Sequence, residues 1–166
     1  MNRLATAIEN LIFARNYTLR FLDAIEPADW FRMPSEGVTH IAWQVGHLAM
    51  AEYRLALDRL RGVRPEDANL ISESFLRRYG RESIPDPDLA KNPSIAEIRA
   101  TFDRVHEQTL LELRAFPEED LDTAPTKPHP LAATKLECLH WCSHHEMIHA
   151  GQIALLRRLL GKKYMW

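Results

Sequence analysis

The sequence has only two cysteines in 166 residues, Cys138 and Cys142. They stand four positions apart within one predicted helix, a spacing that does not favour a structural disulfide. A chain so poor in cysteine is not a disulfide-stabilised secreted domain, and we expect a reducing, cytoplasmic setting.

The chain also lacks a long hydrophobic run and an excess of either charge. No apolar stretch reaches the roughly 18 residues that a membrane span requires, and Arg3, Glu9 and Arg15 near the start do not suit a secretory signal. Lysine and arginine number 21 against 23 aspartates and glutamates, so no net field would recruit nucleic acid or an anionic membrane. We therefore expect a small-molecule substrate as the partner and leave a homodimer open.

Strand-like alternation is absent, whereas hydrophobic residues recur with helical periodicity in four long segments. The segments cover about residues 3–25, 39–61, 94–116 and 134–160. Some thirty residues link the second segment to the third, and "LISESFLRRY" within them predicts a short helix. A link of this length can cross a bundle, so the second and third helices can run parallel. The sequence predicts a single all-α domain over residues 1–166, an up-down-down-up four-helix bundle.

Capping signals mark the starts of three of these helices. Ser94 with Glu97, and Thr134 with Glu137, have the spacing of capping boxes. Thr39 is the expected N-cap of the second helix.

The stretch "HHEMIHAGQ" in the last helix contains the H-E-x-x-H pattern of zinc proteases, with His145, Glu146 and His149. His140 and His144 are also one turn apart, but they fall on a different, more polar face. The pair His145 and His149 shares the apolar face, which is expected to point inward, with Cys138, Trp141, Cys142, Ile148, Gln152, Leu156 and Leu160.

Two inward histidines one turn apart indicate a metal site rather than a packing role. A single core histidine is readily satisfied by a carbonyl, but each member of this pair must satisfy two ring nitrogens away from water, which a shared metal does at once. A zinc protease takes its third ligand after the second histidine. Residues 150–166 contain no histidine, aspartate, glutamate or cysteine, and Gln152 and Leu155 occupy the extended motif's glycine and histidine positions. The sequence therefore argues against a protease and requires an upstream ligand.

That ligand is expected on the second helix, which is apolar nearly all round except for one polar stripe containing His47. Such a stripe predicts a border to a cavity, and its other polar members are His40, Gln44, Arg54 and Asp58. A site of His47, His145 and His149 suits Zn, Ni or Fe and leaves coordination positions for water or substrate.

Several neighbouring roles stay open. Cys142 is either an extra ligand or, more readily, a small core residue, and His106 either supports the site or is a satisfied core histidine. Arg15, within an apolar stripe, must find an acid, a carbonyl or an anionic ligand. The candidates to contact the metal ligands or the substrate are Gln44, Arg54, Gln152 and Cys142.

Two stretches, "WQVGHLAMAE" and "HHEMIHAGQIALLRRLLG", resemble the DinB-like superfamily of DNA-damage-inducible and YfiT-like metalloenzymes. The likeness covers nearly the whole chain, including the long crossover and a histidine pair followed closely by Gly-Gln. It implies an up-down-down-up bundle that binds one divalent metal through His47, His145 and His149. Glu146 lies about 100° from the ligand stripe, so its match to the protease pattern looks incidental.

The resemblance implies metal-centred chemistry but not one reaction, because the superfamily includes thiol-dependent transferases and an isomerase. We expect activation of a low-molecular-weight thiol for attack on a small electrophile, with a hydrolase that activates water as the alternative. A third interpretation is a non-catalytic, stress-related metal-binding bundle, which a closed coordination sphere would favour.

Overall fold

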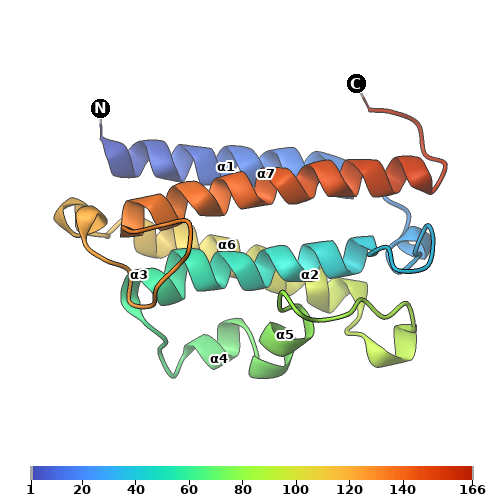
Figure 1. Ribbon diagram of the computed structural model, residues 1–166, viewed down its shortest axis with the longest axis horizontal. Coiled ribbons are helices and arrows are strands. Elements are labelled where there is room, and N and C mark those ends of the chain that lie inside the picture. Colours follow the sequence, from blue (N-terminus) through green and yellow to red (C-terminus); the bar gives the residue numbers. More distant parts are fainter. Residues whose placement is uncertain (1, 166) are drawn as a thin grey trace.

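The computed structural model describes residues 2–165, which are all-helical and contain no β-strand. Four long helical segments lie alongside one another in Figure 1. They are α1 (Arg3–Leu22), a continuous rod of α2 (Ile41–Glu52), η2 (Tyr53–Asp58) and α3 (Arg59–Arg61), then α6 (Ile95–Leu113) and α7 (Lys135–Leu159). The shorter elements are η1 (Pro27–Asp29), α4 (Asp67–Leu70), α5 (Glu73–Arg78), η3 (Leu89–Lys91) and η4 (Glu118–Asp122). Within residues 2–165 no helix combines the length and hydrophobicity needed to cross a bilayer.

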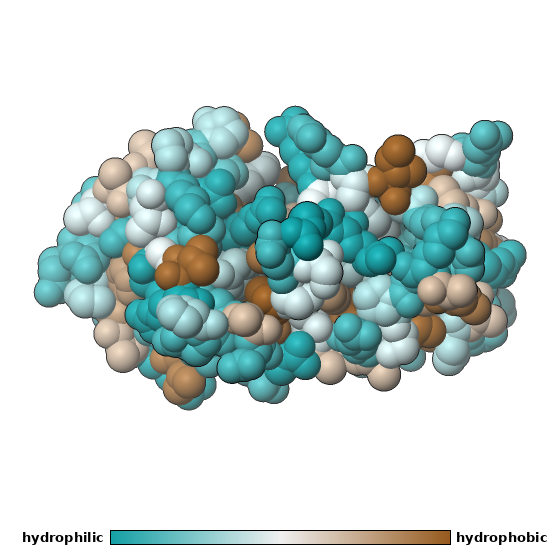
Figure 2. Space-filling model, turned by 90° about the horizontal axis from the view of Figure 1, so that it is seen from below, coloured by the Kyte–Doolittle hydropathy of each residue, from teal (hydrophilic) through white to brown (hydrophobic). Residues whose placement is uncertain are grey.

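The long crossover is present and returns the chain to the end at which α2 began. In Figure 1, α2 and α6 run in one direction while α1 and α7 run in the opposite one. Residues 62–94 join the parallel pair, and within them α4 packs against α6 and α5 against α2. The short helix predicted in this link is α5. The face seen in Figure 2 is mostly hydrophilic, and its hydrophobic residues are scattered.

The helix starts follow the predicted capping chemistry fully at α7, through the Ser94 half of the predicted capping box at α6, and not at α2. Thr134 and Glu137 form both hydrogen bonds of a capping box, and the hydroxyl of Ser94 accepts from the backbone N–H of Glu97. The N-cap of α2 is His40 rather than Thr39, since the His40 Nδ1 accepts the Trp43 N–H at 3.1 Å. A neutral imidazole offers one acceptor nitrogen, so it replaces the expected hydroxyl.

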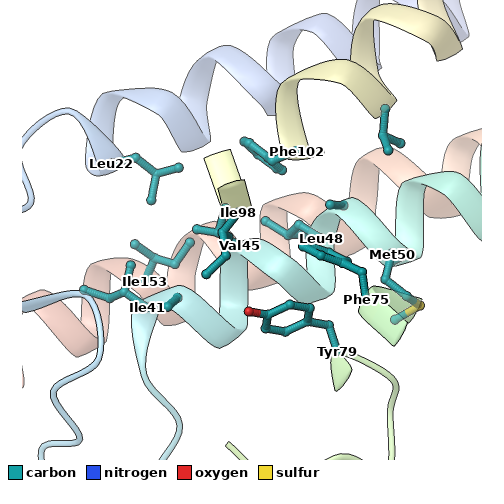
Figure 3. Close-up of a cluster of buried hydrophobic side chains, with 14 of the residues drawn as sticks. Leu22, Ile41, Val45, Leu48, Met50, Phe75, Tyr79, Ile98, Phe102 and Ile153 are labelled. Carbon is teal, nitrogen blue, oxygen red and sulfur yellow. The ribbon is translucent and has the colours of Figure 1, made fainter. Parts of the chain in front are cut away.

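The hydrophobic core lies between the long segments and reaches the crossover (Figure 3). Val45 of α2 meets Ile98 and Phe102 of α6, and all three are fully buried. On the other side of α2, the ring of Tyr79 packs against the backbone at Gly46. A Cβ at position 46 would lie 2.5 Å from the Tyr79 ring, so only glycine permits this contact.

The buried face of α7 differs from the predicted one by a rotation about the helix axis. Ile148 is 50% exposed and Gln152 is also exposed, although both were expected to point inward. Glu146, Ala150 and Ile153 are buried instead. The reason is that α7 packs against both α1 and α2, so its interior face lies between the two contacts rather than along the line of most apolar residues. The pair His145 and His149 consequently lies at the α2 edge of this face.

A charged network occupies the core and accounts for three residues whose roles the sequence left open. The Arg15 guanidinium donates to Glu146 at 2.9 Å, to Glu52 at 2.6 Å and to the Phe102 carbonyl at 2.9 Å. The His106 ring bonds the other Glu52 oxygen at 2.8 Å. Burial raises the pKa of both carboxyl groups. At Glu52 the combined effect of Arg15 and His106 outweighs burial and the pKa is lowered, whereas at Glu146 burial prevails and the pKa stays raised. Arg15 thus finds two acids and a carbonyl.

Candidate metal centre

Three imidazoles meet between α2 and α7. His47 projects from α2, and His145 and His149 stand one turn apart on α7. One ring nitrogen from each lies within 4.8 Å of the others. The ring centroids are 4.4 Å apart for the α7 pair, and 4.8 and 5.2 Å from His47 to His149 and His145. These are the three residues that the sequence selected, and the structure brings them together.

The hydrogen bonds of two rings leave their Nε2 atoms free to bind a metal. The His47 Nδ1 is 2.8 Å from the carbonyl oxygen of Tyr79, which can only accept, so Nδ1 carries the proton. The His149 Nδ1 likewise carries a proton and donates it to the side-chain oxygen of Gln44. Fixing the proton on Nδ1 in this way orients a ligating histidine and increases its basicity. Gln44, a candidate from the sequence, therefore orients one of the three imidazoles.

Burial keeps the cluster neutral. It is the main cause that lowers the pKa of His145 to about 4 and that of His149 to about 3, and the positive charge of neighbouring rings adds to it. The pKa of His47 is lowered too, first by burial and then by the Arg54 charge. Near neutral pH all three imidazoles are therefore uncharged, and each keeps one nitrogen lone pair, which is the form that binds metal.

Aromatic side chains fix the walls of the cluster. The Trp43 indole stacks on His47 at 4.7 Å between ring centroids, and its N–H donates to the Ser83 hydroxyl at 2.9 Å. Trp141 lies against His145 at 6.1 Å, and His129 from the loop before α7 lies beside Trp141 at 6.2 Å. Both indoles are half-buried, so they limit access of water to the imidazoles without closing the site.

Two contributors to this site escaped the sequence analysis. Tyr79 acts through its backbone carbonyl, and any residue type carries one, so its own identity gives no signal. Gly46, directly before His47, was the available clue, because a glycine inside a helix often marks close approach of another segment. His129 lies in a proline-rich loop without periodicity and could not be placed.

The other candidates are not members of the three-histidine group. Cys142 is buried, and its pKa is raised well above the usual range by burial and by the carboxylates of Glu52 and Glu146. Within the described part of the chain, the one group of ligands close enough to share an ion contains only the three histidines, so Cys142 does not complete it. Gln152 is exposed on the outer side of α7, and Arg54 is exposed on η2.

The remaining histidines and Glu146 have separate roles. His40 caps α2, and its Nε2 donates to the Asp86 carbonyl at 3.1 Å. His144 is exposed, and His140 is half-buried on α7 outside the group. Glu146 points into the core toward Arg15 at 2.9 Å. The H-E-x-x-H motif therefore contains two histidines of the candidate metal centre and a glutamate that is paired with Arg15 in the core.

The spacing of the free nitrogens fits a shared ion. The Nε2 atoms of His145 and His149 are 3.2 Å apart, and two nitrogens bound tetrahedrally at about 2.0–2.1 Å would be separated by roughly 3.3 Å. The set of three neutral imidazoles suits a borderline divalent cation such as Zn, Ni or Fe.

Comparison with known proteins identifies the family of the chain. The family model of the DinB superfamily matches residues 10–153 of the chain. The protein therefore belongs to the DinB superfamily, which is metal-binding. No curated protein matches the chain.

Proposed function

We propose that this protein is a metal-dependent enzyme that activates a thiol, or alternatively water, for attack on a small electrophile. His47, His145 and His149 would hold the ion, on an up-down-down-up four-helix bundle. The observation that carries the proposal is the convergence of three neutral imidazoles, with no fourth protein ligand among the described residues. Three protein ligands leave positions for an exogenous molecule, as catalytic rather than structural sites do.

A divalent ion bound here supplies a Lewis acid that lowers the pKa of a coordinated thiol or water. Residues of the chain orient the imidazoles and shield them from water. The Tyr79 carbonyl and the Gln44 amide hold His47 and His149 with their Nε2 lone pairs directed into the cluster. The half-buried indoles of Trp43 and Trp141 reduce the water around it, which strengthens electrostatic interactions inside.

The arrangement favours a thiol over water because the cluster contains no carboxylate. Attack by water commonly uses a side chain that removes a proton in the transition state. The acid nearest in sequence, Glu146, is already paired with Arg15 in the core. A thiol that has lost its proton is a nucleophile without further help.

Two alternatives remain distinguishable. A hydrolase would use the same three ligands with water as the nucleophile. A non-catalytic metal-binding bundle would show an ion whose coordination sphere does not exchange with added ligands.

The test uses protein prepared without a nickel-affinity step, analysed for metal and then loaded with Co²⁺. Adding a low-molecular-weight thiol should produce a near-ultraviolet thiolate-to-cobalt charge-transfer band. A His145→Ala/His149→Ala variant should lose the metal, whereas the matched His140→Ala/His144→Ala variant, one turn away, should keep it. If no thiol gives the band but the cobalt still takes up other ligands, the thiol chemistry is wrong and the hydrolase becomes the better proposal. A spectrum unchanged by every added ligand would instead favour the non-catalytic bundle.

A further inference from the structure

A cavity of about 630 Å³ lies between η2 and the crossover. Its wall includes Arg54, Asp58 and Arg59 from the rod, Leu76 from α5, and Lys127 from the loop before α7. Arg54 follows His47 by seven residues, which is nearly two helical turns and places it on the same side of the rod, about 10 Å along the axis. It stands on the single π-helical stretch, a distortion often found at functional sites.

The acids in this wall are already neutralised. Asp58 is paired with Lys127 at 2.8 Å and Asp67 with Arg61 at 2.8 Å. Glu73 is paired with Arg77 on α5. Each of these carboxylates therefore already has a cationic partner, and the one oxygen among them that is buried without a hydrogen bond is the Asp58 Oδ1.

Two arginines in the wall have no carboxylate partner among residues 2–165. Arg59 donates only to backbone carbonyls, those of Arg54 at 3.1 Å and Pro128 at 3.4 Å, and its Nε is buried without a partner. The Arg54 side chain is exposed and forms no ion pair with any residue in the described range 2–165. By contrast, Arg64 in the same wall faces Glu112 at 3.5 Å. The cavity thus holds two uncompensated positive charges.

The loop before α7 joins Arg59 to the surroundings of the metal centre. Arg59 donates to the Pro128 carbonyl, and the next residue, His129, places its ring beside Trp141, which lies next to His145. The loop that carries His129 is fixed to the end of the rod, because Thr126 bonds the carbonyls of Asp58 and Arg59. This loop therefore connects Arg59 with the surroundings of the imidazole cluster, and Arg54 stands on the same side of the rod as His47.

We propose that Arg54 and Arg59 form an anion-binding subsite beside the imidazole cluster, so that the molecule that reaches the metal carries a carboxylate or phosphate group. The inference rests on the proposed function for its metal and adds the substrate class. Arginine is suited to this role because its planar donors match both oxyanions.

The test compares pairs of thiols that differ only in charge, on cobalt-loaded protein. The pairs are 3-mercaptopropionate with 3-mercaptopropanol and 6-mercaptohexanoate with 6-mercaptohexanol, each titrated on the charge-transfer band. The acid of at least one pair should bind roughly tenfold more tightly than its alcohol, as expected for a hydrogen bond to a charged group. Added salt should reduce the preference because Arg54 is exposed.

The variants separate the subsite from general effects on the fold. Arg54→Gln should abolish the preference while cobalt content and the alcohol affinities stay unchanged, and Arg59→Gln should weaken it. Arg64→Gln is the matched control, since it lines the same cavity but is paired with Glu112, and it should keep the preference. Equal binding of acid and alcohol by the wild type, or a preference that survives in Arg54→Gln, would overturn the proposal.

Failure of the thiol chemistry can be told from failure of the subsite. If no thiol gives the band, imidazole-4-acetate and 4-methylimidazole are compared on the visible bands of cobalt. A preference for the acid that Arg54→Gln removes supports the subsite, and its absence overturns it. If cobalt does not bind at all, calorimetric titration of succinate into wild type and Arg54→Gln at low salt gives the same decision.

Discussion

Replacing Arg15 by methionine should destabilise the protein more than any surface substitution. The side chains of Arg15, Glu52 and Glu146 are 3%, 2% and 4% exposed. Methionine fills much of the same volume but leaves two carboxylates in the core, of which Glu52 keeps the His106 ring as a partner while Glu146 loses the hydrogen bonds it made to Arg15. Removing one partner of a buried ion pair costs about 3–5 kcal/mol, a large part of the roughly 5–15 kcal/mol by which domains are stable.

Urea unfolding followed by circular dichroism measures this loss. With a slope of about 2 kcal/mol per molar urea, the midpoint should fall by roughly 2 M. The deficit should also depend on pH. Burial already raises the pKa of Glu146, and loss of Arg15 raises it further. A carboxyl group whose pKa is raised in the folded protein contributes stability at pH values below its pKa in the unfolded chain, and this contribution is lost as the pH rises through the folded pKa. The loss of stability in Arg15→Met should therefore become smaller when the pH is lowered from 7 to 5.

Two comparison variants make the result decisive. Arg15→Met with Glu52→Gln and Glu146→Gln removes the stranded charges and should recover much of the loss. Arg77→Met breaks only an exposed pair with Glu73 and should change the free energy of unfolding by less than about 1 kcal/mol. If Arg15→Met costs no more than Arg77→Met, or if the triple variant is no more stable than the single one, the electrostatic account of this core is wrong.

Three further changes test the site and its surroundings. Gly46→Ala should displace the Tyr79 ring and its carbonyl, raising the metal dissociation constant about 10–100-fold in a chelator competition; Tyr79→Phe keeps ring and carbonyl and should leave the constant unchanged. Gln44→Ala frees the His149 ring and should weaken metal binding by a similar factor, so wild-type affinity would argue against its positioning role. Glu146→Gln should retain metal and thiol binding but lower the free energy of unfolding by about 1–3 kcal/mol, whereas loss of activity in a stable, metal-loaded variant would contradict a core role.

Periodicity and capping were sufficient to predict the long helices. The three-histidine cluster could also be predicted, because His47, His145 and His149 stand out as polar residues on apolar helices. The predicted inward position of Gln152 is wrong for a physical reason. A helical wheel assigns one inward direction, but α7 packs against two neighbours, and its buried face lies between them.

The partners of the network residues depend on tertiary structure that no local pattern records. Arg15 meets Glu52 and Glu146 across 37 and 131 positions of sequence. The Tyr79 carbonyl reaches His47 across 32 positions, from a segment with little periodicity of its own. Such contacts follow from the packing of helices, so the sequence showed that Arg15 needs partners without showing which.

The bond from His47 to the Tyr79 carbonyl gives the crossover a role beyond joining two helices. Because His47 and the end of α5 share one hydrogen bond, binding of an ion at the imidazoles would be thermodynamically linked to order in the crossover. Such linkage is reciprocal: a molecule that holds the crossover in place would tighten metal binding by the same factor by which the metal favours that molecule. A ligand in the cavity between η2 and the crossover would therefore help to retain the ion on which its own chemistry depends.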